Sequence, residues 1–429
     1  MTYQPRKILG FDSWTGGAFN FARLLPALAE RNMALTILHI GSWGSDPGRP
    51  SREMIGDLEF RDVSFYPGKN FDEILALEQP DAVLMLSTQT YAHRAFLRYC
   101  KQRGIPTLHL YHGVANVQVT DDTVGSHKIG LVSYAKYALP KVGKLIRRTF
   151  PCYIRALLKT GAKPHEWARF VGDVVRQARA LPALRAADDA GTTKGAVYTN
   201  TDIEHAVRVY GFAERDVIAV GNPDLLRFGF GIEDLGTQNR RTLDLEYVMY
   251  IDTALAIVGL LFKSEESFIE HLVQTAQSLR PLGKKLAFKP HPAHDAAFLA
   301  RSLDGTGIEI VPNDRFVARL KDCCACISET TSVALIPALA GLPLLFAQYG
   351  ELREQRFGPA LTGYPRGYKL ENLEDIGDIL RADAERADHK AISDWIEFNA
   401  GPLPAQDMPR RIAGVVQSMI TDDQAIRTM

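Results

Sequence analysis

The chain repeats one pattern from its first residues onward: an apolar run, a polar or glycine-rich loop, an amphipathic helix and another apolar run. "KILGF" is followed by the loop "DSWTGG", the helical pattern "AFNFARLLPALAERN" and the apolar run "ALTILHI". This order predicts β-α-β units with parallel, buried strands. We therefore expect an α/β fold, in which ligands bind at the carboxyl ends of the strands.

The alternation occurs in two series, and 429 residues exceed one ordinary core, since single domains hold about 150–250 residues. We expect an N-terminal Rossmann-like domain over residues 1–235 and a C-terminal Rossmann-like domain over 245–390. The two domains should face each other across a cleft. Residues 391–429 are predicted to form a helical segment that can pack back on the first domain.

A basic segment from about residue 128 to 180 interrupts the first series. Its twelve lysines and arginines stand against two acids, Glu166 and Asp173, and aromatic and aliphatic residues lie between the charges. Such a segment suits the surface of an anionic membrane or a polyanionic acceptor. The alternative is a solvated helical insert whose charges meet acids elsewhere.

Composition excludes several classes of protein. The formal net charge is zero, whereas nucleic-acid binding requires a basic surplus. Of the five cysteines, only Cys323 and Cys326 show a C-x-x-C spacing, and no second such spacing pairs with it, so neither a zinc site nor a disulfide framework is expected. The N-terminus lacks an apolar signal run. We expect a cytoplasmic protein that can act at the inner face of the cytoplasmic membrane.

The familiar nucleotide and hydrolase motifs are missing. The chain has no P-loop, no G-x-G-x-x-G after a strand, no G-x-S-x-G and no H-E-x-x-H. No apolar strand ends in Asp-x-Asp, a common way to hold a nucleotide-sugar diphosphate through a metal. We therefore expect chemistry without a bound metal or cofactor.

Two strand-end loops of the first series carry candidate catalytic groups. Asp12 follows the first strand, and Gly16 and Gly17 precede a helix, where glycine permits close approach to a ligand and a carboxylate can act as a general base. His112 ends a strand before a glycine and can accept a proton from an acceptor hydroxyl or hold a phosphate. The alternatives are a helix-capping aspartate and a structural histidine.

The segment "FKPHPAHD" ends a strand of the second series. Two prolines stiffen the turn and direct the side chains of Lys289 and His291 toward a ligand. Asp295 and His294 are expected to serve the following helix. A metal site at these histidines would need a further ligand, and the spacing is generic.

The segment "CISETTSVALIPALAGLP" has a buried strand that passes directly into a helix. A helix N-terminus with hydroxyl side chains is a good anion site, and an acid there can accept from ribose hydroxyls. The residues assigned to this site are Glu329, Thr330, Thr331 and Ser332. If the sheet is parallel, they share its ligand-binding edge with Lys289 and His291.

These motifs, in this order, resemble the GT-B glycosyltransferases of the bacterial capsule, sialyl-, Kdo- and teichoic-acid type. "KPHPAHD" resembles their His-Pro motif, "SETTS" their Ser/Thr motif and "YHGVANVQ" the His-Gly motif of the teichoic-acid polymerase group. "VIAVGNPDLLRFG", with Asn222, is similar to the segment that ends their N-terminal domain. The teichoic-acid group has Asp-Tyr-Ser-Ser in place of "SETTS", and the acidic motif of the sialyltransferases is not cleanly present.

The resemblance implies a metal-independent glycosyltransferase of bacterial surface polysaccharide, capsule, lipopolysaccharide or lipid-linked glycan synthesis. The implied donor is a CMP-activated sugar of the Kdo or sialic-acid type. Asp12 or His112 would deprotonate the acceptor, Glu329 would orient the ribose, and Asn222 would line the donor site. The alternatives are a UDP-sugar or CDP-polyol transferase, a nucleotide-sugar 2-epimerase of the same fold, and a non-catalytic, membrane-docked assembly factor.

Overall fold

The computed structural model describes most of the chain, in segments separated by short gaps and by one longer gap. The described residues are 4–12, 17–44, 48–88, 90–111, 113, 145–178, 193–237, 243–253, 256 and 262–428. Three sequence predictions therefore lie outside the described residues: those for Gly16, for His112 and for the first part of the basic segment.

The N-terminal domain is built on an eight-stranded sheet in the order β3-β4-β2-β1-β5-β6-β7-β8. All neighbouring strands are parallel except the edge pair β3 and β4. The strands are β1 (Arg6–Asp12), β2 (Met33–His39), β3 (Arg52–Ile55), β4 (Leu58–Asp62), β5 (Ala82–Met85), β6 (Thr107–Leu110), β7 (Lys194–Val197) and β8 (Val217–Ala219).

Alternate residues of β1 bury two different faces, as the twofold strand period requires. Ile8 packs with α1 (Ala18–Ala22), α2 (Leu25–Ala29) and the C-terminal helix α17 (Met408–Thr428). Leu9 and Phe11 pack with α3 (Phe71–Glu78) and α4 (Tyr91–Gln102) on the opposite face. Helices therefore cover both faces of the sheet, and its strand ends are left as the edge at which ligands can bind.

The second half of the basic segment forms α6 (Phe150–Lys159) and α7 (Pro164–Ala178). Tyr153 and Leu157 are fully buried against the α3–α4 face. The two acids of the segment bind arginines of α4: Asp173 pairs with Arg94 at 3.0 Å, and Glu166 pairs with Arg98. These helices are therefore docked on the domain, while several basic side chains remain exposed.

The C-terminal domain has a six-stranded, entirely parallel sheet in the order β11-β10-β9-β12-β13-β14. Numbered within the domain, this is the doubly wound order 3-2-1-4-5-6, which places ligands where the order reverses, between β9 and β12. The strands are β9 (Tyr247–Ile251), β10 (Lys285–Lys289), β11 (Glu309–Ile310), β12 (Cys323–Ser328), β13 (Leu344–Ala347) and β14 (Gly367–Leu370).

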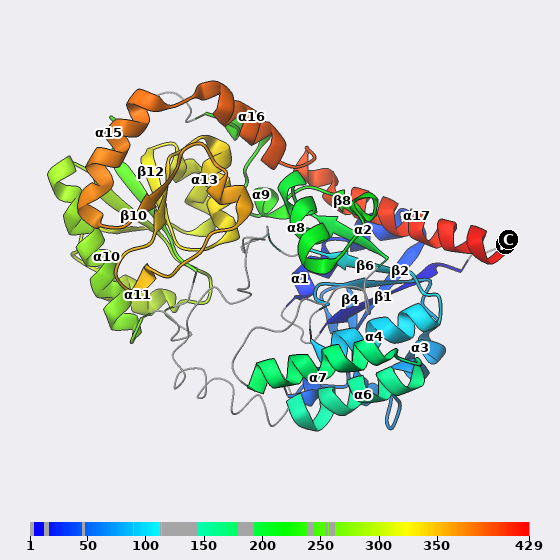
Figure 1. Ribbon diagram of the computed structural model, residues 1–429. Coiled ribbons are helices and arrows are strands. Elements are labelled where there is room, and N and C mark those ends of the chain that lie inside the picture. The colour runs from blue at the N-terminus through cyan, green and yellow to red at the C-terminus, as the bar shows by residue number, and fades with distance from the viewer. Residues whose placement is uncertain are drawn as a thin grey trace.

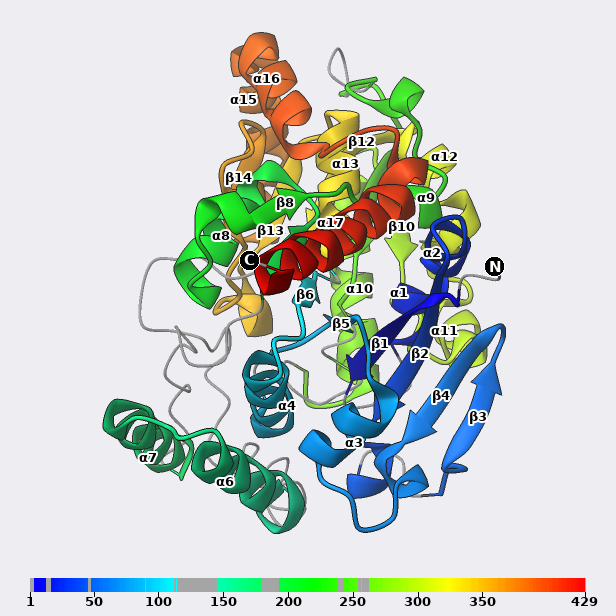
Figure 2. The ribbon, with the colours of Figure 1, turned by 90° about the vertical axis from the view of Figure 1, so that its right-hand side faces the viewer.

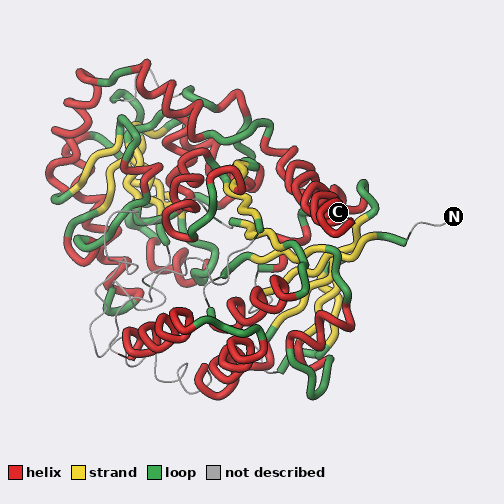
Figure 3. Tube along the Cα trace, turned by 45° about the vertical axis from the view of Figure 1, so that its right-hand side comes forward, coloured by secondary structure: helices red, strands yellow, loops and turns green. Residues whose placement is uncertain are grey.

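The remaining helices lie on the last strands of the first sheet, around the second sheet and at the junction of the two domains. They are α8 (Asn200–Tyr210), α9 (Pro223–Arg227), α10 (Glu265–Leu279), α11 (Ala296–Leu303), α12 (Phe316–Leu320), α13 (Leu335–Ala340), α14 (Pro359–Thr362), α15 (Ile376–Arg386) and α16 (His389–Asn399). Helix α8 of the first domain packs on α14 and α16 of the second. Figures 1 and 3 show the two groups of strands side by side, each with its own helices.

Helix α17 returns from the C-terminal domain and lies across the first domain, on the face opposite α6 and α7 (Figure 2). Its Met408, Ile412 and Met419 are buried against the face of the sheet to which Ile8 of β1 points. Arg411 donates to the carbonyl of Val220 at 2.9 Å, and Arg410 pairs with Glu30. The last helix therefore ties the two domains together.

The predicted α/β class with two Rossmann-like sheets is confirmed. In the N-terminal sheet, too, the strand order reverses, at β1 and β5, so Asp12 at the end of β1 lies at a switch point. Within the part of the chain that the structure describes, every helix is too short or too polar to span a membrane.

Candidate functional site

The switch point of the C-terminal sheet carries a buried aspartate. Asp252 directly follows β9, and its Oδ2 accepts a hydrogen bond from the backbone N–H of His291 at 3.1 Å. The same oxygen lies 2.7 Å from Nε2 of His294. Asp252 therefore holds the turn of the His-Pro segment against the end of the neighbouring strand.

The two histidines of that segment have different surroundings. His291 is exposed, and its Nδ1 accepts from the N–H of Ala293 at 3.1 Å. The side chain of His294 is buried and stacks on Phe268, with ring centroids 5.6 Å apart. The prediction that His294 serves the following helix is wrong, since Asp252 binds its ring instead.

Asp295 was predicted to cap the following helix, and this prediction is confirmed. Its Oδ1 accepts from the N–H groups of Ala297 and Phe298 at the start of α11. Among the described residues, no three His, Cys, Asp or Glu side chains form a group that could hold a metal ion. The expectation of metal-independent chemistry stays a prediction.

Lys289, the last residue of β10, is only 3% exposed. Its Nζ donates to the carbonyl of Pro290 at 2.8 Å and lies 5.4 and 5.8 Å from the ring centroids of Phe228 and Phe316. Burial, together with the charge of Arg227, lowers the pKa of Lys289 to about 8. No salt bridge joins this ammonium to any carboxylate of the described residues.

Glu329 follows β12 on the other side of the switch point and is fully buried. The hydroxyl of Tyr250 donates to its Oε1 at 2.8 Å, and the hydroxyl of Thr253 donates to its Oε2 at 2.7 Å. Burial beside Asp252 raises the pKa of Glu329 to about 8. Its carboxyl group fixes the loop after β9, and its predicted contact with a ribose stays a prediction.

The hydroxyl residues after Glu329 are placed unequally. The hydroxyl of Thr330 lies 2.8 Å from Oε1 of Gln355 and 3.0 Å from the carbonyl oxygen of Arg356, and its single hydrogen can be donated to either acceptor. The hydroxyl of Thr331 caps the 3₁₀ turn η8 (Ser332–Ala334) that leads into α13. Ser332 opens that turn, and all three residues are partly exposed.

In the N-terminal domain, Asp12 is 4% exposed at the end of β1. Gly17 lies so close that a Cβ there would be 2.7 Å from Oδ2 of Asp12 and 2.8 Å from Leu86, which follows β5. A side chain at position 17 would therefore collide with the carboxylate. The close approach of a ligand at this glycine and the role of Asp12 as a general base stay predictions.

The carboxyl ends of the two sheets approach each other at one described contact. A Cβ placed on Gly113, just beyond β6 of the first sheet, would lie 3.7 Å from Oγ of Ser332, just beyond β12 of the second. The glycine of the His-Gly motif therefore adjoins the Ser/Thr motif. The strand-end loops of the two domains therefore meet at this point.

Asn222 is buried at the start of α9. Its Oδ1 accepts from the N–H of Asp224 at 2.9 Å, whereas its Nδ2 is buried without a described partner. Sequence reasoning missed Asp252 and Arg227. The first could have been found as the acid directly after "YVMYI", but Arg227 reaches Lys289 only through the packing of α9.

Comparison with known proteins gives only distant matches. No protein-family model matches the chain, and no curated protein matches it. Among solved structures, the UDP co-structure of S. aureus MnaA is 14% identical, with 97% of each chain covered and a TM-score of 0.47. The wall teichoic acid polymerase TagF is 10% identical over 97% of this chain and 89% of that one, with a TM-score of 0.48.

A further match is the glycotransferase of kitacinnamycin, which is 13% identical over 97% of this chain and 100% of that one, with a TM-score of 0.49. At these scores the likeness assigns no residue and no ligand. The class follows from the chain's own topology: two doubly wound sheets with adjoining carboxyl edges and a returning C-terminal helix form a GT-B-like fold.

Proposed function

We propose that the protein is a nucleotide-sugar enzyme that binds the donor nucleotide between the ends of β9, β10 and β12. The observation that carries this proposal is Lys289, a buried ammonium at a doubly wound switch point. It forms no salt bridge with a described carboxylate, and the charge of Asp252 offsets its burial only in part, since the pKa is still lowered. Buried charges are stable only when they are paired. A phosphate is the counter-ion that such a site fits best.

The reaction we propose is glycosyl transfer without a bound metal, in the synthesis of a bacterial surface polysaccharide or a lipid-linked glycan. The donor is a CMP-activated sugar of the Kdo or sialic-acid type, consistent with the His-Pro and Ser/Thr motifs. Because Gly113 of the N-terminal domain adjoins Ser332, an acceptor bound by that domain can reach a donor held by the C-terminal domain.

In the proposed mechanism, Asp12 removes the proton of the acceptor hydroxyl, or His112 does so. The acceptor oxygen then bonds to the anomeric carbon while the bond from that carbon to the phosphate oxygen breaks. The departing phosphate takes the bonding electrons, and its charge is stabilised by Lys289, His291 and the Thr330–Ser332 turn. Glu329 holds the loop after β9 through Thr253 and Tyr250 and so fixes the shape of the donor site.

Thermal-shift measurements with CMP, CDP, UDP and their sugars test the proposal. A cytidine nucleotide should raise Tm, and His291→Ala should abolish this shift while His165→Ala, an exposed histidine on α7, leaves it unchanged. Asp12→Ala should keep the shift and lose turnover. No shift with any nucleotide would overturn every enzymatic assignment.

Turnover without an acceptor distinguishes the transferase from the alternative 2-epimerase. Incubation with the donor alone should leave the sugar's configuration unchanged, apart from slow hydrolysis. Epimerised donor would reject the transferase and retain the nucleotide site. A UDP-dependent shift would likewise retain the site and reject the cytidine assignment.

A further inference from the structure

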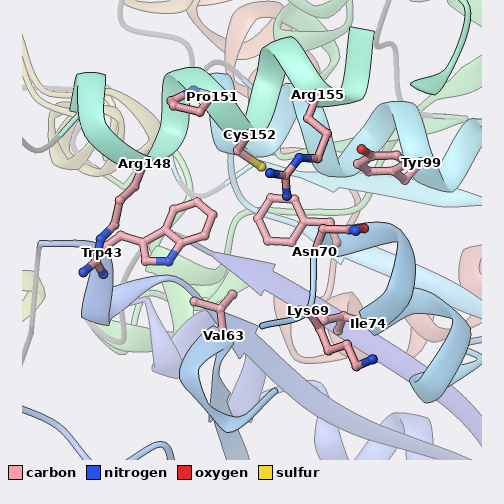
Figure 4. A pocket seen from close by; sticks show the side chains of 11 residues that line it. Trp43, Val63, Lys69, Asn70, Ile74, Tyr99, Arg148, Pro151, Cys152 and Arg155 are labelled. Carbon is pink, nitrogen blue, oxygen red and sulfur yellow. The ribbon is translucent and has the colours of Figure 1, made fainter. Parts of the chain in front are cut away.

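A cavity of about 190 Å³, separate from the proposed donor site, lies between α6 and the rest of the N-terminal domain (Figure 4). Its floor is largely apolar and comes from four elements: Trp43 of η1 (Gly41–Trp43), Phe71 and Ile74 of α3, Tyr99 of α4 and Cys152 of α6. Nothing in the donor site uses these residues. We call this cavity the α3–α6 pocket.

Three cations surround the α3–α6 pocket. Figure 4 shows Arg148 and Arg155 projecting from the same helical segment on either side of Cys152, with Lys69 across from them. Arg148 donates to the carbonyl of Ser42 at 3.0 Å, and Lys69 lies 3.8 Å from an exposed glutamate. Arg155 forms no salt bridge with a described carboxylate. The pocket therefore combines an apolar floor with a positive rim.

The hydroxyl of Tyr99 supplies an independent indication of a ligand. Tyr99 is 1% exposed, lines the pocket, and its hydroxyl is buried without a hydrogen-bond partner among the described residues. Buried hydroxyls in native proteins nearly always have a partner. An oxygen of a bound ligand would satisfy this group next to the guanidinium of Arg155.

The pocket lies near the edge of the sheet that carries Asp12. Trp43 follows β2 and Val63 follows β4, so both stand beyond the carboxyl ends of their strands. Phe71 packs edge-on against Phe11, the neighbour of Asp12, with ring centroids 5.3 Å apart. A ligand in the pocket would therefore lie on the α3–α4 face of the sheet, near the carboxyl end of the strand that carries Asp12.

We propose that the α3–α6 pocket binds an anionic amphiphile: an apolar ring or short chain lies in the cavity, and its phosphate or carboxylate lies among Lys69, Arg148 and Arg155. A cavity of about 150 Å³ holds benzene, so this one holds about one ring or six to eight carbons. Binding of this ligand does not depend on the proposed enzymatic activity. Its role as the acceptor's anchor rests on the proposed transferase function.

Titration calorimetry with octyl phosphate tests the pocket, with inorganic phosphate and octanol as the head and the tail alone. Octyl phosphate should bind at least about tenfold more tightly than either part, because both the charge and the apolar floor contribute. Equal binding of inorganic phosphate would reduce the site to a surface charge cluster. No binding of octyl phosphate would overturn the proposal.

Variants separate the pocket from the rest of the basic segment. Replacing Arg148 and Arg155 together by alanine should weaken octyl phosphate at least about tenfold, and Tyr99→Phe, which removes one oxygen, about threefold or more. Lys159→Ala, exposed on α6 outside the pocket, should change nothing. If Lys159→Ala weakens binding as much as the double variant, the pocket is not the site.

Two further measurements define the ligand's source and its relation to the donor site. Vesicles of phosphatidylcholine with one-fifth phosphatidylglycerol compete with octyl phosphate if the ligand is a membrane lipid, and do not compete if it is a soluble amphiphile. Nucleotide thermal shifts should persist in the double variant. A nucleotide failure with octyl phosphate binding intact would reject the donor site and leave the pocket standing.

Discussion

Replacing Lys289 by methionine should stabilise the protein and weaken the proposed binding of the donor phosphate. The ammonium lies over the neighbouring rings of Phe228 and Phe316, where a thioether of similar length makes favourable aromatic contacts. A pKa lowered from 10.5 to about 8 corresponds to about 3 kcal/mol at 1.36 kcal/mol per pKa unit. Residual solvent at the edge of the site reduces the expected gain to about 1–3 kcal/mol.

The stability difference between the wild type and Lys289→Met should depend on pH. The unfolded lysine keeps its proton up to pH 10.5, whereas the folded lysine loses it near pH 8. Between these values the unfolded state binds more protons, so the stability of the wild type rises with pH relative to Lys289→Met. The excess in free energy of unfolding of Lys289→Met over the wild type should therefore fall by about 2 kcal/mol between pH 7 and pH 9.5.

Urea denaturation at both pH values measures these free energies, and Lys285→Met, at the exposed start of the same strand, is the matched control. In the same variants, nucleotide affinity should fall about 10- to 100-fold for Lys289→Met and stay unchanged for Lys285→Met. A Lys289→Met protein that is less stable than the wild type at pH 7, with a gap independent of pH, would show that the ammonium is not desolvated.

Three further predictions concern the rest of the molecule. The pKa of Glu329 is raised to about 8, so its contribution to stability is lost as pH rises from 4.5 through 8; Glu329→Gln should lose less stability than the wild type between pH 6 and pH 9 in thermal melts. Asp173→Ala removes the buried carboxylate that pairs with Arg94 of α4 and should lower the free energy of unfolding by about 3–5 kcal/mol in urea denaturation. A loss below about 1 kcal/mol would mean that this pair does not hold α7. Flotation with anionic liposomes should weaken when three basic residues of the segment, Lys144, Arg147 and Arg148, are neutralised. Unchanged flotation would mean that the basic segment is solvated and does not bind membranes.

Much of the fold could be predicted because each apolar run and each helical pattern is local. The strand ends that carry Asp12, Lys289 and Glu329 follow from the same reading. The orientation of the side chains could not be predicted. Lys289 lies inward because Phe228, from a distant segment, packs over it, and neither sequence spacing nor charge reveals this contact.

The partners of the histidines depend on pairing across the sheet. His294 binds Asp252, 42 residues earlier in the chain, because β9 and β10 are neighbouring parallel strands. A sequence reader sees Asp295 beside His294 and assigns both to the helix. The α3–α6 pocket was even less predictable from the sequence, since its walls come from segments that lie far apart in the chain, from Trp43 to Arg155.

The central claim is that Lys289 is the buried cation for a donor phosphate at the switch point of the second sheet. A crystal structure with the cytidine nucleotide that raises Tm tests it directly. We predict a phosphate oxygen about 3 Å from Nζ of Lys289, with the nucleotide between the ends of β9 and β12 and beside Ser332. A nucleotide bound elsewhere, or with its phosphates away from Lys289, would contradict the account.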